Sequence, residues 1–448
     1  MLRDLAKYHK PAPRYTSYPT APEWGALGSS TYLENLKSFA KSDKPLSLYF
    51  HIPFCHKICL FCACAAIANR KIENEKRYVD ALCKEIDLVT QALGKKLTVP
   101  QIHFGGGTPT KLSEKLMSQL FEKITTSFEI DFSKEVAIEI DPRTVSPEKL
   151  RFLRDLGFNR VSFGVQDVDP KVQEAIKRRQ SAEMTEETYL CARELGFEGI
   201  NLDLIYGLPY QTRKSFSRTV ETILTLRPDR IALFSYAKVP WLKPHQKAIR
   251  DETLPSTEEK FKIYEAARQA FIENGYVAIG MDHFALETDE MARAYHDKTL
   301  RRNFQGYTVE HAEDSIGFGI TAIGYLEKSY FQNLKGLVPY YTSLNNAELP
   351  ICRGLILNKE DLIRKWVIHT LMCTFELNKE EFAQKFGLNF DHHFAHELEK
   401  LEESELIHIT PQKLIATPLG ELFIRNSAMV FDDYLNKKTT QPQFSQSI

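Results

Sequence analysis

The chain has 448 residues, of which 43% are hydrophobic and 26% are charged, and its formal net charge is -1. This composition is ordinary for a soluble globular protein, and the length allows two or three domains with a large core. A net charge near zero gives no bulk attraction to nucleic acid or to an acidic membrane, so any anion-binding site must be local.

No apolar run reaches the length of a transmembrane helix, and the first residues lack the apolar stretch of a secretory signal. The sequence therefore predicts a cytoplasmic protein without membrane insertion. Four of the eight cysteines, Cys83, Cys191, Cys352 and Cys373, are scattered singly, which favours small core residues over disulfides.

The first 44 residues contain Pro11, Pro13, Pro19 and Pro22 and are predicted to form an irregular arm with one amphipathic segment at 30–39. A regular alternation follows, in which short apolar runs are separated by stretches of helical periodicity. The runs predicted to be buried strands lie at 46–51, 102–104, 136–140, 160–164, 200–206 and 230–235.

Several of these units share one junction, in which a helix stops at a glycine before the next strand begins. Gly157, Gly196 and Gly275 fit the left-handed C-cap, while Ser146 and Ser256 fit helix N-caps. The region shows no hairpin signals, which favours a parallel sheet covered by helices on its outer side. We therefore expect an α/β fold, a partial (β/α)6-type barrel that is open or closed.

From about residue 340 the pattern changes. Helical segments are predicted at 359–375 and 390–405, followed by β-like runs at 406–409 and 413–417 and a last helix at 419–435. This order suggests a small helical, winged-helix-like domain, but the basic stripe needed for DNA binding is missing. The expected division is an arm at 1–44, a catalytic barrel at 45–340 and a C-terminal domain at 341–448.

Cys55, Cys59 and Cys62 lie within eight residues, directly after the first predicted strand. Three thiolates are one fewer than a closed zinc site or a fully ligated iron-sulfur cube uses, which indicates a cluster with one open iron. A zinc site that also includes Cys64 is the alternative, although Cys62 and Cys64 are closer together than the usual spacing of roughly two to four residues. The C-x3-C-x2-C pattern, with Phe61 before its last cysteine, resembles the radical S-adenosylmethionine (radical SAM) enzymes.

Further polar and glycine residues occur where the predicted strands end, the place where a parallel barrel carries its chemistry. Glu139 is a carboxylate in an otherwise apolar strand and needs a partner, such as a ribose hydroxyl or an ammonium group. Arg178 could instead belong to a charged helix surface. The residues that follow or end the other strands are Gly105, Gly106, Gly107 and Thr108, then Gln166 and Ala237, with Asp203 inside its strand.

The glycine run at 105–107 is not a P-loop, because the glycine-lysine-serine/threonine ending is absent. A plain turn between strand and helix is one interpretation. The other is a close approach of the backbone to a ligand, with its N-H and C=O groups offered for hydrogen bonds.

Over nearly its whole length the chain resembles the family of oxygen-independent coproporphyrinogen III oxidases (dehydrogenases), radical SAM enzymes of haem biosynthesis. The matching segments are 13–20, 49–64, the Gly105 segment, 164–167, 201–209, 280–284, 303–307 and 443–448. The resemblance implies that coproporphyrinogen III loses carbon dioxide from two propionates, which become vinyl groups, to give protoporphyrinogen IX. It also implies a [4Fe-4S] cluster, two S-adenosylmethionine molecules and a 5'-deoxyadenosyl radical as the oxidant.

Carried over residue by residue, the resemblance implies that Cys55, Cys59 and Cys62 bind the cluster and that Cys64 and Tyr49 are catalytic. The S-adenosylmethionine on the cluster would contact Tyr49, Gly106, Gly107, Glu139 and Ile323. The second molecule would contact Phe61, Ala63, Thr108, Thr110, Gln166, Arg178, Asp203 and Ala237, with Phe304 and Gln305 close to both. Cys64 would face this second molecule or the substrate, and a buried thiol is the alternative interpretation.

The sequence departs from the usual family pattern beside Cys64. Ala63 stands where glycine is usual, and Ala65 stands where asparagine is usual. The missing amide at Ala65 removes two donors and one acceptor, which affects substrate positioning more than cluster assembly. Lys298, Arg301 and Arg302 are further candidates, for binding the substrate propionates, with an exposed basic loop as the alternative interpretation.

The partners implied are coproporphyrinogen III, a reductant such as flavodoxin or ferredoxin, and an unidentified electron acceptor. The rival functions are a haem chaperone, a haem-modifying methyltransferase and an inactive haem-binding protein, because fold alone does not decide function. The sequence has no heptad repeat and no exposed apolar stripe that would indicate oligomerisation, so a monomer is expected.

Overall fold

Six parallel strands form the main sheet in a computed structural model that describes residues 7–437 and 444–446. They are β2 (Ser47–Ile52), β5 (Thr98–Gly106), β6 (Glu129–Ile140), β7 (Arg160–Gln166), β8 (Gly199–Tyr206) and β9 (Arg230–Ser235). Each pairs in parallel with the next one in this order, as in Phe50↔Phe104 and Phe163↔Leu202. The six predicted strands and their parallel arrangement are confirmed.

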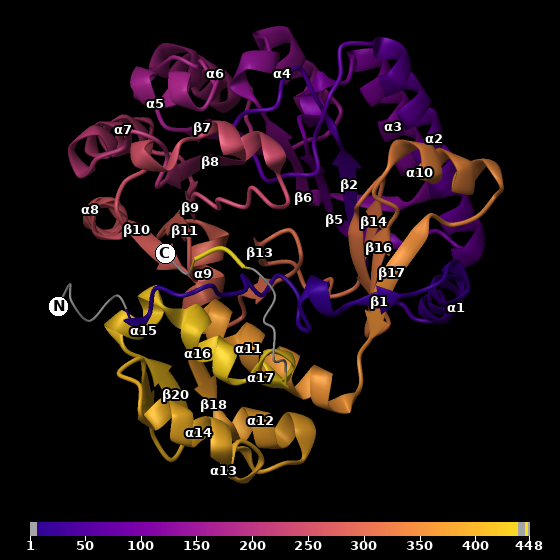
Figure 1. Cartoon of the computed structure of the whole chain (residues 1–448). Helices are drawn as coiled ribbons and strands as arrows, with labels where there is room; N and C mark the ends of the chain where they lie inside the picture. The colour runs from indigo at the N-terminus through magenta and orange to yellow at the C-terminus, as the bar shows by residue number, and fades with distance from the viewer. Residues whose placement is uncertain (1–6, 438–443, 447–448) are drawn as a thin grey trace. The chain divides into compact units, whose positions relative to one another are not determined.

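Helices connect these strands, which gives the alternation that the sequence predicts. They include α2 (Ile72–Leu93), α3 (Glu114–Ser127), α4 (Pro147–Asp155), α6 (Ala182–Glu194) and α7 (Arg213–Leu226), and Figure 1 shows them on the outer side of the sheet. Ser146 caps α4 by accepting a hydrogen bond from the Lys149 amide, as predicted. The predicted C-cap glycines, Gly157 and Gly196, have φ of 106° and 76°.

The chain forms two compact units, each built from separate stretches of sequence. We call residues 25–259 and 310–356 the sheet unit. The terminal unit consists of the described residues among 1–24, 260–309 and 357–448. The predicted division at residues 44 and 340 remains a prediction.

An antiparallel extension of the main sheet was not predicted. β14 (Ser315–Phe318) pairs in parallel with β2, and β15 (Ile323–Leu326), β16 (Ser329–Asn333), β17 (Ile351–Ile356) and β1 (Gly25–Ala26) follow in antiparallel order. The turn between β15 and β16 is the two-residue loop Glu327 and Lys328, with φ of 49° and 62°. Such turns normally use Asn or Gly, so this hairpin had no recognisable signal. The predicted amphipathic segment forms α1 (Ser29–Phe39).

Aromatic side chains fill the core under the parallel strands. Phe50 stacks on Phe104 and on Phe318, both with ring centroids 4.9 Å apart, and all three side chains are buried. Deep packing of this kind fixes the strand register, because a slip by one residue would turn the rings to the other face. The strand ends are therefore held on a rigid base.

The terminal unit begins its second stretch with most of α8 (Thr257–Glu273), followed by the hairpin β10 (Tyr276–Ile279) and β11 (His283–Leu286). Phe261, Tyr264 and Phe271 are buried along one side of α8. α9 (Glu290–His296) and the short pair β12 (Arg301–Arg302) and β13 (Tyr307–Thr308) complete this stretch.

The C-terminal part of this unit is helical with a small antiparallel sheet. α11 (Lys359–Thr374) is followed by β18 (Glu376–Asn378), α12 (Lys379–Phe386), α13 (Phe390–His393), α14 (Ala395–Glu402), β19 (Ile407–Ile409) and β20 (Lys413–Ala416). The chain then forms α15 (Pro418–Leu422), α16 (Ile424–Val430) and α17 (Asp433–Lys437). The helix predicted at 390–405 is interrupted at Phe394, and the last predicted helix is interrupted at Phe423 and again after Val430, where buried aromatic side chains set the direction of the chain.

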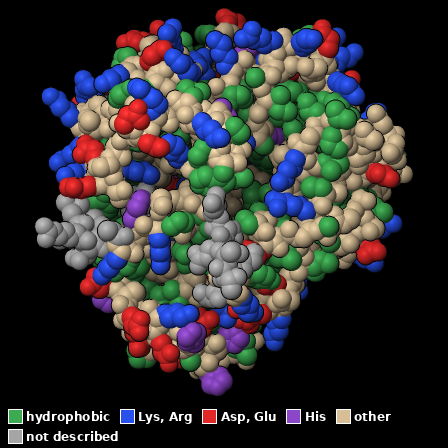
Figure 2. Space-filling view, viewed as in Figure 1, with side chains coloured by type: hydrophobic (Ala, Val, Ile, Leu, Met, Phe, Trp, Pro, Cys, Tyr) green, Lys and Arg blue, Asp and Glu red, His purple; other side chains and the backbone are tan. Residues whose placement is uncertain are grey.

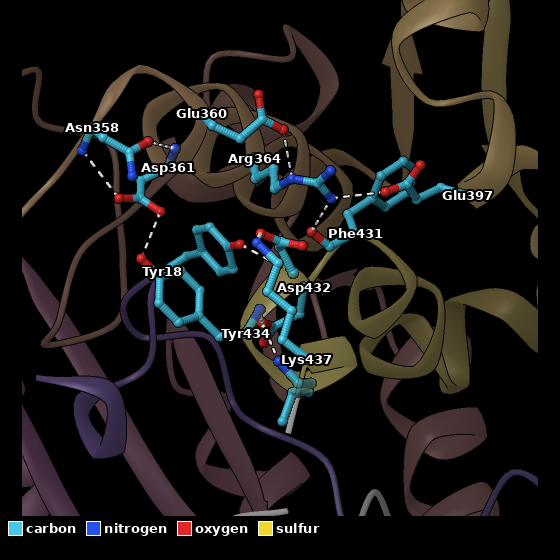
Figure 3. Close-up of polar contacts among 12 residues, drawn as sticks. Tyr18, Asn358, Glu360, Asp361, Arg364, Glu397, Phe431, Asp432, Tyr434 and Lys437 are labelled. Atoms are coloured by element: carbon cyan, nitrogen blue, oxygen red, sulfur yellow. Dashed lines mark hydrogen bonds and ion pairs between the residues drawn. The ribbon is translucent and has the colours of Figure 1, made fainter. Parts of the chain in front are cut away.

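The N-terminal arm is tied to these helices within the terminal unit. Tyr15 donates a hydrogen bond to Asp432 at 3.0 Å, and the Asp433 amide donates to the Tyr18 hydroxyl at 3.2 Å. Figure 3 shows Tyr18 beside Asp432 and Tyr434, whose hydroxyl donates to Asp361 at the start of α11. The irregular arm predicted from its prolines is therefore ordered by tertiary contacts.

On the face seen in Figure 2, Lys and Arg side chains are interspersed with Asp and Glu, in line with the net charge of -1. Among residues 7–437 and 444–446, no helix combines the length and apolar character needed to cross a membrane.

Candidate active site

The carboxyl ends of the parallel strands carry the residues that sequence reasoning selected in the sheet unit. Residues 55–64, which we call the cysteine loop, follow β2. Gly106 and Gln166 end β5 and β7, Glu139 is the last residue but one of β6, and Asp203 lies within β8. Parallel pairing puts these ends at one edge of the sheet, where ligands of such folds bind.

The first two cysteines of the loop are held by different neighbours. Cys55 ends the short strand β3 (Phe54–Cys55), which pairs with β4 (Ile67–Ala68), and burial raises the pKa of its thiol to about 11. Cys59 is buried. Its Sγ lies 3.8 Å from Nη2 of Arg143 and also 3.8 Å from Nη1 of Arg178. Two cations thus lie next to one sulfur of the cysteine loop.

Cys62 and Cys64 share a hydrogen bond that separates their acidities. The bond from Cys64 lowers the pKa of Cys62 to about 7, helped by the charges of Lys243 and Arg178. The same hydrogen bond raises the pKa of Cys64, and desolvation by the surrounding protein adds to this effect. Part of the Cys64 side chain is still exposed to solvent. The side chains of Cys62 and Cys64 therefore interact directly within the cysteine loop.

Within the described part of the chain, no group of three or more Cys, His, Asp or Glu side chains surrounds a point that could hold a single metal ion. A cube-shaped cluster instead takes its thiolates at separate corners. The cluster assignment thus depends on the spacing and surroundings of the cysteines rather than on sulfurs gathered at one point.

Three side chains from the segment after β9 hold the second half of the cysteine loop, and sequence reasoning missed all three. Lys243 donates to the Cys64 carbonyl at 2.6 Å, His245 contacts the Cys62 carbonyl at 2.8 Å, and Gln246 donates to the Phe61 carbonyl at 2.8 Å. These pairs lie 179 to 185 positions apart in sequence, and no spacing rule could find them.

A hydrogen-bonded chain connects β2 to the end of the cysteine loop. The Tyr49 hydroxyl lies 3.0 Å from His51 Nδ1, and His51 Nε2 lies 2.9 Å from the Ala65 carbonyl. A carbonyl only accepts, so Nε2 carries the proton and Nδ1 accepts from Tyr49. Burial lowers the pKa of His51 and raises that of Tyr49, which keeps both neutral.

Glu139 is held by two donors from β5. His103 Nε2 lies 3.3 Å from one carboxylate oxygen, and the Gly106 amide donates to the other at 3.1 Å. Burial by itself would raise the pKa of Glu139, but the hydrogen bond and charge of His103 outweigh it and hold that pKa below its usual value. Glu139 is thus a fixed anion at this edge.

The glycines at 106 and 107 make room for protein atoms. A Cβ on Gly107 would lie 2.5 Å from the Pro53 carbonyl oxygen, and one on Gly106, whose φ is 116°, would lie 2.7 Å from the His51 ring. The amides of Gly106, Gly107 and Thr108 donate to Glu139, Ile52 and Phe54. A ligand at this turn would therefore meet its carbonyl groups, since these N-H groups are already used.

Arg178 is buried, whereas its neighbours are exposed. Its guanidinium donates to the Gly164 carbonyl at 2.6 Å and pairs with Asp141 at 3.2 Å, and its Nε has no hydrogen-bond partner. Lys177 and Arg179 instead pair with Glu174 on the surface. The run is therefore not a uniformly charged helix face, and Arg178 is the member directed inward.

Gln166 and Asp203 lie on neighbouring strands. Gln166 has a φ of 70° at a register shift between β7 and β8, a backbone conformation that redirects a side chain and often marks a functional position. Asp203 accepts hydrogen bonds from Ser162 at 3.1 Å and Asn201 at 2.7 Å. Both residues are ordered by the strands around them.

The other selected residues of the sheet unit have varied surroundings. Thr108 lies 3.3 Å from Cys55 Sγ, and Thr110 is 2.7 Å from Thr144. Ile323 is buried at the start of β15, Ala63 is exposed, and the Ala237 carbonyl accepts from Gln246 at 3.1 Å. Phe61 packs against a buried cluster that includes Ile176.

Five of the site residues predicted from the sequence belong to the terminal unit. Phe304 lies 6.3 Å from the Trp24 ring, and the Gln305 amide donates to Asn303. Arg302 is buried and donates to the Tyr307 hydroxyl at 3.1 Å, and Lys298 lies 3.8 Å from Glu376. Arg301 is exposed. The segment predicted to match at 443–448 lies partly outside the described residues.

Comparison with protein families gives two matches that follow the chain order. Residues 49–223 match the radical SAM superfamily, and residues 357–423 match the HemN C-terminal domain. The first match contains the cysteine loop and the ends of β5, β6, β7 and β8.

Several curated relatives are similar over their whole length. The oxygen-independent coproporphyrinogen III oxidase of Synechocystis sp. is 43% identical, with 99% of this chain and 97% of the relative covered. That of Pseudomonas aeruginosa is 42% identical, covering 99% and 98%. The rival functions considered above are not favoured by these relatives.

A solved structure agrees with both sequence and fold. It is described as coproporphyrinogen III oxidase (HemN) from Escherichia coli, a radical SAM enzyme, with a TM-score of 0.90 and 39% identity over 94% of this chain and 98% of the other. The α/β radical SAM fold predicted from the sequence is thereby confirmed. The chain belongs to the family of oxygen-independent coproporphyrinogen III oxidases, within the radical SAM superfamily.

Proposed function

We propose that this chain converts coproporphyrinogen III to protoporphyrinogen IX by oxidative decarboxylation of two propionates without oxygen. The observation that carries the proposal is identity of 42 to 43% over 99% of the chain with relatives named for this activity. Such coverage includes both the strand-end residues and the C-terminal region, so the resemblance is not confined to a shared cofactor motif.

The donor set of the cysteine loop fits an iron-sulfur cluster with one open iron. Cys55, Cys59 and Cys62 would be its ligands, and the cations of Arg143 and Arg178 beside Cys59 would balance the negative charge of the thiolates. When bound, the [4Fe-4S] cluster and S-adenosylmethionine would supply the radical chemistry that oxidises a propionate.

The side chains around the loop have distinct roles in the proposal. Tyr49, fixed by His51, and Glu139, fixed by His103, would orient the S-adenosylmethionine on the cluster, as a phenol and a carboxylate suit its polar groups. Gly106, Gly107 and Ile323 complete its surroundings.

A second S-adenosylmethionine is part of the proposal. The buried Arg178, whose Nε has no partner, is a donor available to a carboxylate ligand. The other proposed contacts are Phe61, Ala63, Cys64, Thr108, Thr110, Gln166, Asp203 and Ala237. Phe304 and Gln305 stay predictions from the family resemblance. Cys64 is proposed as catalytic because its exposed side chain is hydrogen-bonded to Cys62, one of the proposed cluster ligands.

Ala65 bears on substrate positioning. The backbone carbonyl of Ala65 accepts the hydrogen bond from His51, so this contact does not depend on the side chain at position 65. The loop conformation is thus maintained without the asparagine usual in the family, and only the amide's own contacts would be lost.

Of the basic candidates for propionates, Arg301 is the most available. Arg302 and Lys298 have partners within the terminal unit, whereas Arg301 is exposed. The proposed reductant is a flavodoxin or ferredoxin, with an unidentified final acceptor, and the proposed state is a cytoplasmic monomer.

The test is an anaerobic assay of the reconstituted full chain with coproporphyrinogen III, S-adenosylmethionine and a reductant. We expect protoporphyrinogen IX, identified by its mass, only when all three are present. Formation of 5'-deoxyadenosine without a vinyl product would reject the substrate and leave the radical chemistry intact.

A further inference from the structure

We infer that Lys243, His245 and Gln246 form a carbonyl clamp that fixes the second half of the cysteine loop before a cluster is bound. These are positioning residues, because they contact the loop backbone and reach the reaction only through it. The inference rests on the proposed cluster site and adds the part of the chain that keeps Cys62 in place.

The clamp consists of three side-chain donors from one short segment. They hold the carbonyls of Phe61, Cys62 and Cys64 at 2.6 to 2.8 Å. Because a carbonyl only accepts, His245 presents its protonated Nε2. Gln246 is 0% exposed, so its bonds are shielded from competition with water.

The first half of the loop has a different support. The Asn69 amide donates to the Cys55 carbonyl at 2.9 Å through the β3–β4 pairing, and the Leu60 amide donates to the Ile176 carbonyl at 3.0 Å. From Cys62 to Cys64 the chain has no strand or helix, and Ala63 and Cys64 are exposed. Side-chain bonds therefore have to supply the order that backbone pairing supplies at Cys55.

Gln246 also joins the loop to a second segment of the proposed site. Its Nε2 donates to the Ala237 carbonyl at 3.1 Å as well as to Phe61, and its Oε1 accepts from the Val239 amide at 2.6 Å. One buried amide thus sets the separation between the cysteine loop and the residues that follow β9. A shift at Gln246 would move the Cys62 ligand relative to Ala237.

The test is hydrogen exchange of the cluster-free full chain, read at the Cys62 amide, which donates to the Cys59 carbonyl at 3.1 Å. Lys243→Met, His245→Leu and Gln246→Leu should each speed exchange at 61–65, by roughly fivefold for every hydrogen bond removed. Lys243→Arg keeps a charged donor and should retain protection. Iron bound per chain after reconstitution should also fall, and it should fall further in a variant that loses more hydrogen bonds.

Gln211 offers a matched control. It is also buried, donates to Asp167 and the Ile205 carbonyl, and accepts from the Leu208 amide. Gln211→Leu therefore removes three hydrogen bonds, as Gln246→Leu does, but none of them involves a loop carbonyl. It should leave exchange at 61–65 unchanged.

The clamp is overturned if Gln246→Leu leaves exchange at 61–65 at the wild-type rate, or if Gln211→Leu speeds it equally. Exchange is measured without substrate or turnover, so it separates the two proposals. An inactive chain whose loop still responds to Gln246→Leu would reject the function and retain the clamp, and an active chain with no response would reject the clamp alone.

Discussion

Arg178 lies with its Nη1 3.8 Å from the Sγ of Cys59. The same guanidinium pairs with Asp141 and donates to the Gly164 carbonyl at the end region of β7. One buried cation thus connects the cysteine loop with the ends of two strands, β6 and β7. Its removal would leave the Asp141 carboxylate with Arg143 as its remaining cation in this group.

Arg178→Met should therefore destabilise the cluster-free chain by about 1 to 3 kcal/mol, because it removes a charged donor from the Gly164 carbonyl and leaves Asp141 with one cation instead of two. Urea unfolding of the purified chain measures this loss. Arg179→Met is the matched control, since Arg179 is 83% exposed and pairs only with the surface Glu174. Equal unfolding midpoints for the two variants would contradict the buried role of Arg178.

Gly107→Ala should lower stability by about 1 to 3 kcal/mol, the usual effect of forcing an extra methyl into packed atoms. The new Cβ would meet the Pro53 carbonyl oxygen at 2.5 Å, and a backbone atom cannot turn aside. Gly25→Ala, where nothing lies within 4 Å, is the control. Thermal unfolding compares them, and similar melting temperatures would refute the close approach at Gly107.

Cys62→Ser should abolish cluster binding, whereas Cys64→Ser should keep it. The reason is the C-x3-C-x2-C spacing, which supplies three ligands in Cys55, Cys59 and Cys62 and leaves Cys64 outside the set. Iron content and visible absorbance after anaerobic reconstitution distinguish the variants. Loss of iron in Cys64→Ser would mean that the set of three ligands is wrong.

Glu85 predicts a pH dependence of stability. It is buried on α2, where it accepts hydrogen bonds from Tyr340 at 2.6 Å and the Gly319 amide at 2.9 Å, yet burial raises its pKa from 4.5 to about 7. A raised pKa means that the folded state binds the proton more tightly. The stabilisation is therefore complete below pH 4.5 and lost as the pH rises to about 7.

The difference between the two pKa values corresponds to about 3 kcal/mol. Glu85→Gln does not titrate, so the wild-type chain should lose stability relative to this variant between pH 5 and 8. Chemical unfolding over that range measures the difference. A constant difference across the range would show that Glu85 is ionised throughout.

Arg425→Met should release the N-terminal arm of the terminal unit. Arg425 donates to the Ala12 carbonyl and to the Gln446 carbonyl, both at 3.1 Å, and so holds the two ends of the described chain. Limited proteolysis should cut residues 7–24 faster in this variant. Arg301→Met, at an exposed position, should leave the cleavage rate of residues 7–24 unchanged. Equally fast cleavage in both variants would contradict the role of Arg425 in holding the arm.

Local signals were sufficient for much of the fold. The six parallel strands, the Ser146 cap and the glycine C-caps follow from short-range backbone and side-chain preferences, which are written within a few residues. The strands β14 to β17 were missed because β14 pairs with the distant β2 and because Glu327 and Lys328 adopt a turn that usually needs Asn or Gly.

The sequence by itself determined the cysteine spacing, the strand order and the family, because each is a property of neighbouring residues or of similarity along the chain. Only the tertiary structure decided that Arg178 points inward while Arg179 stays outside, and that Lys243, His245 and Gln246 hold the cysteine loop. Such contacts join residues far apart in sequence, and they exist only once packing has brought their segments together.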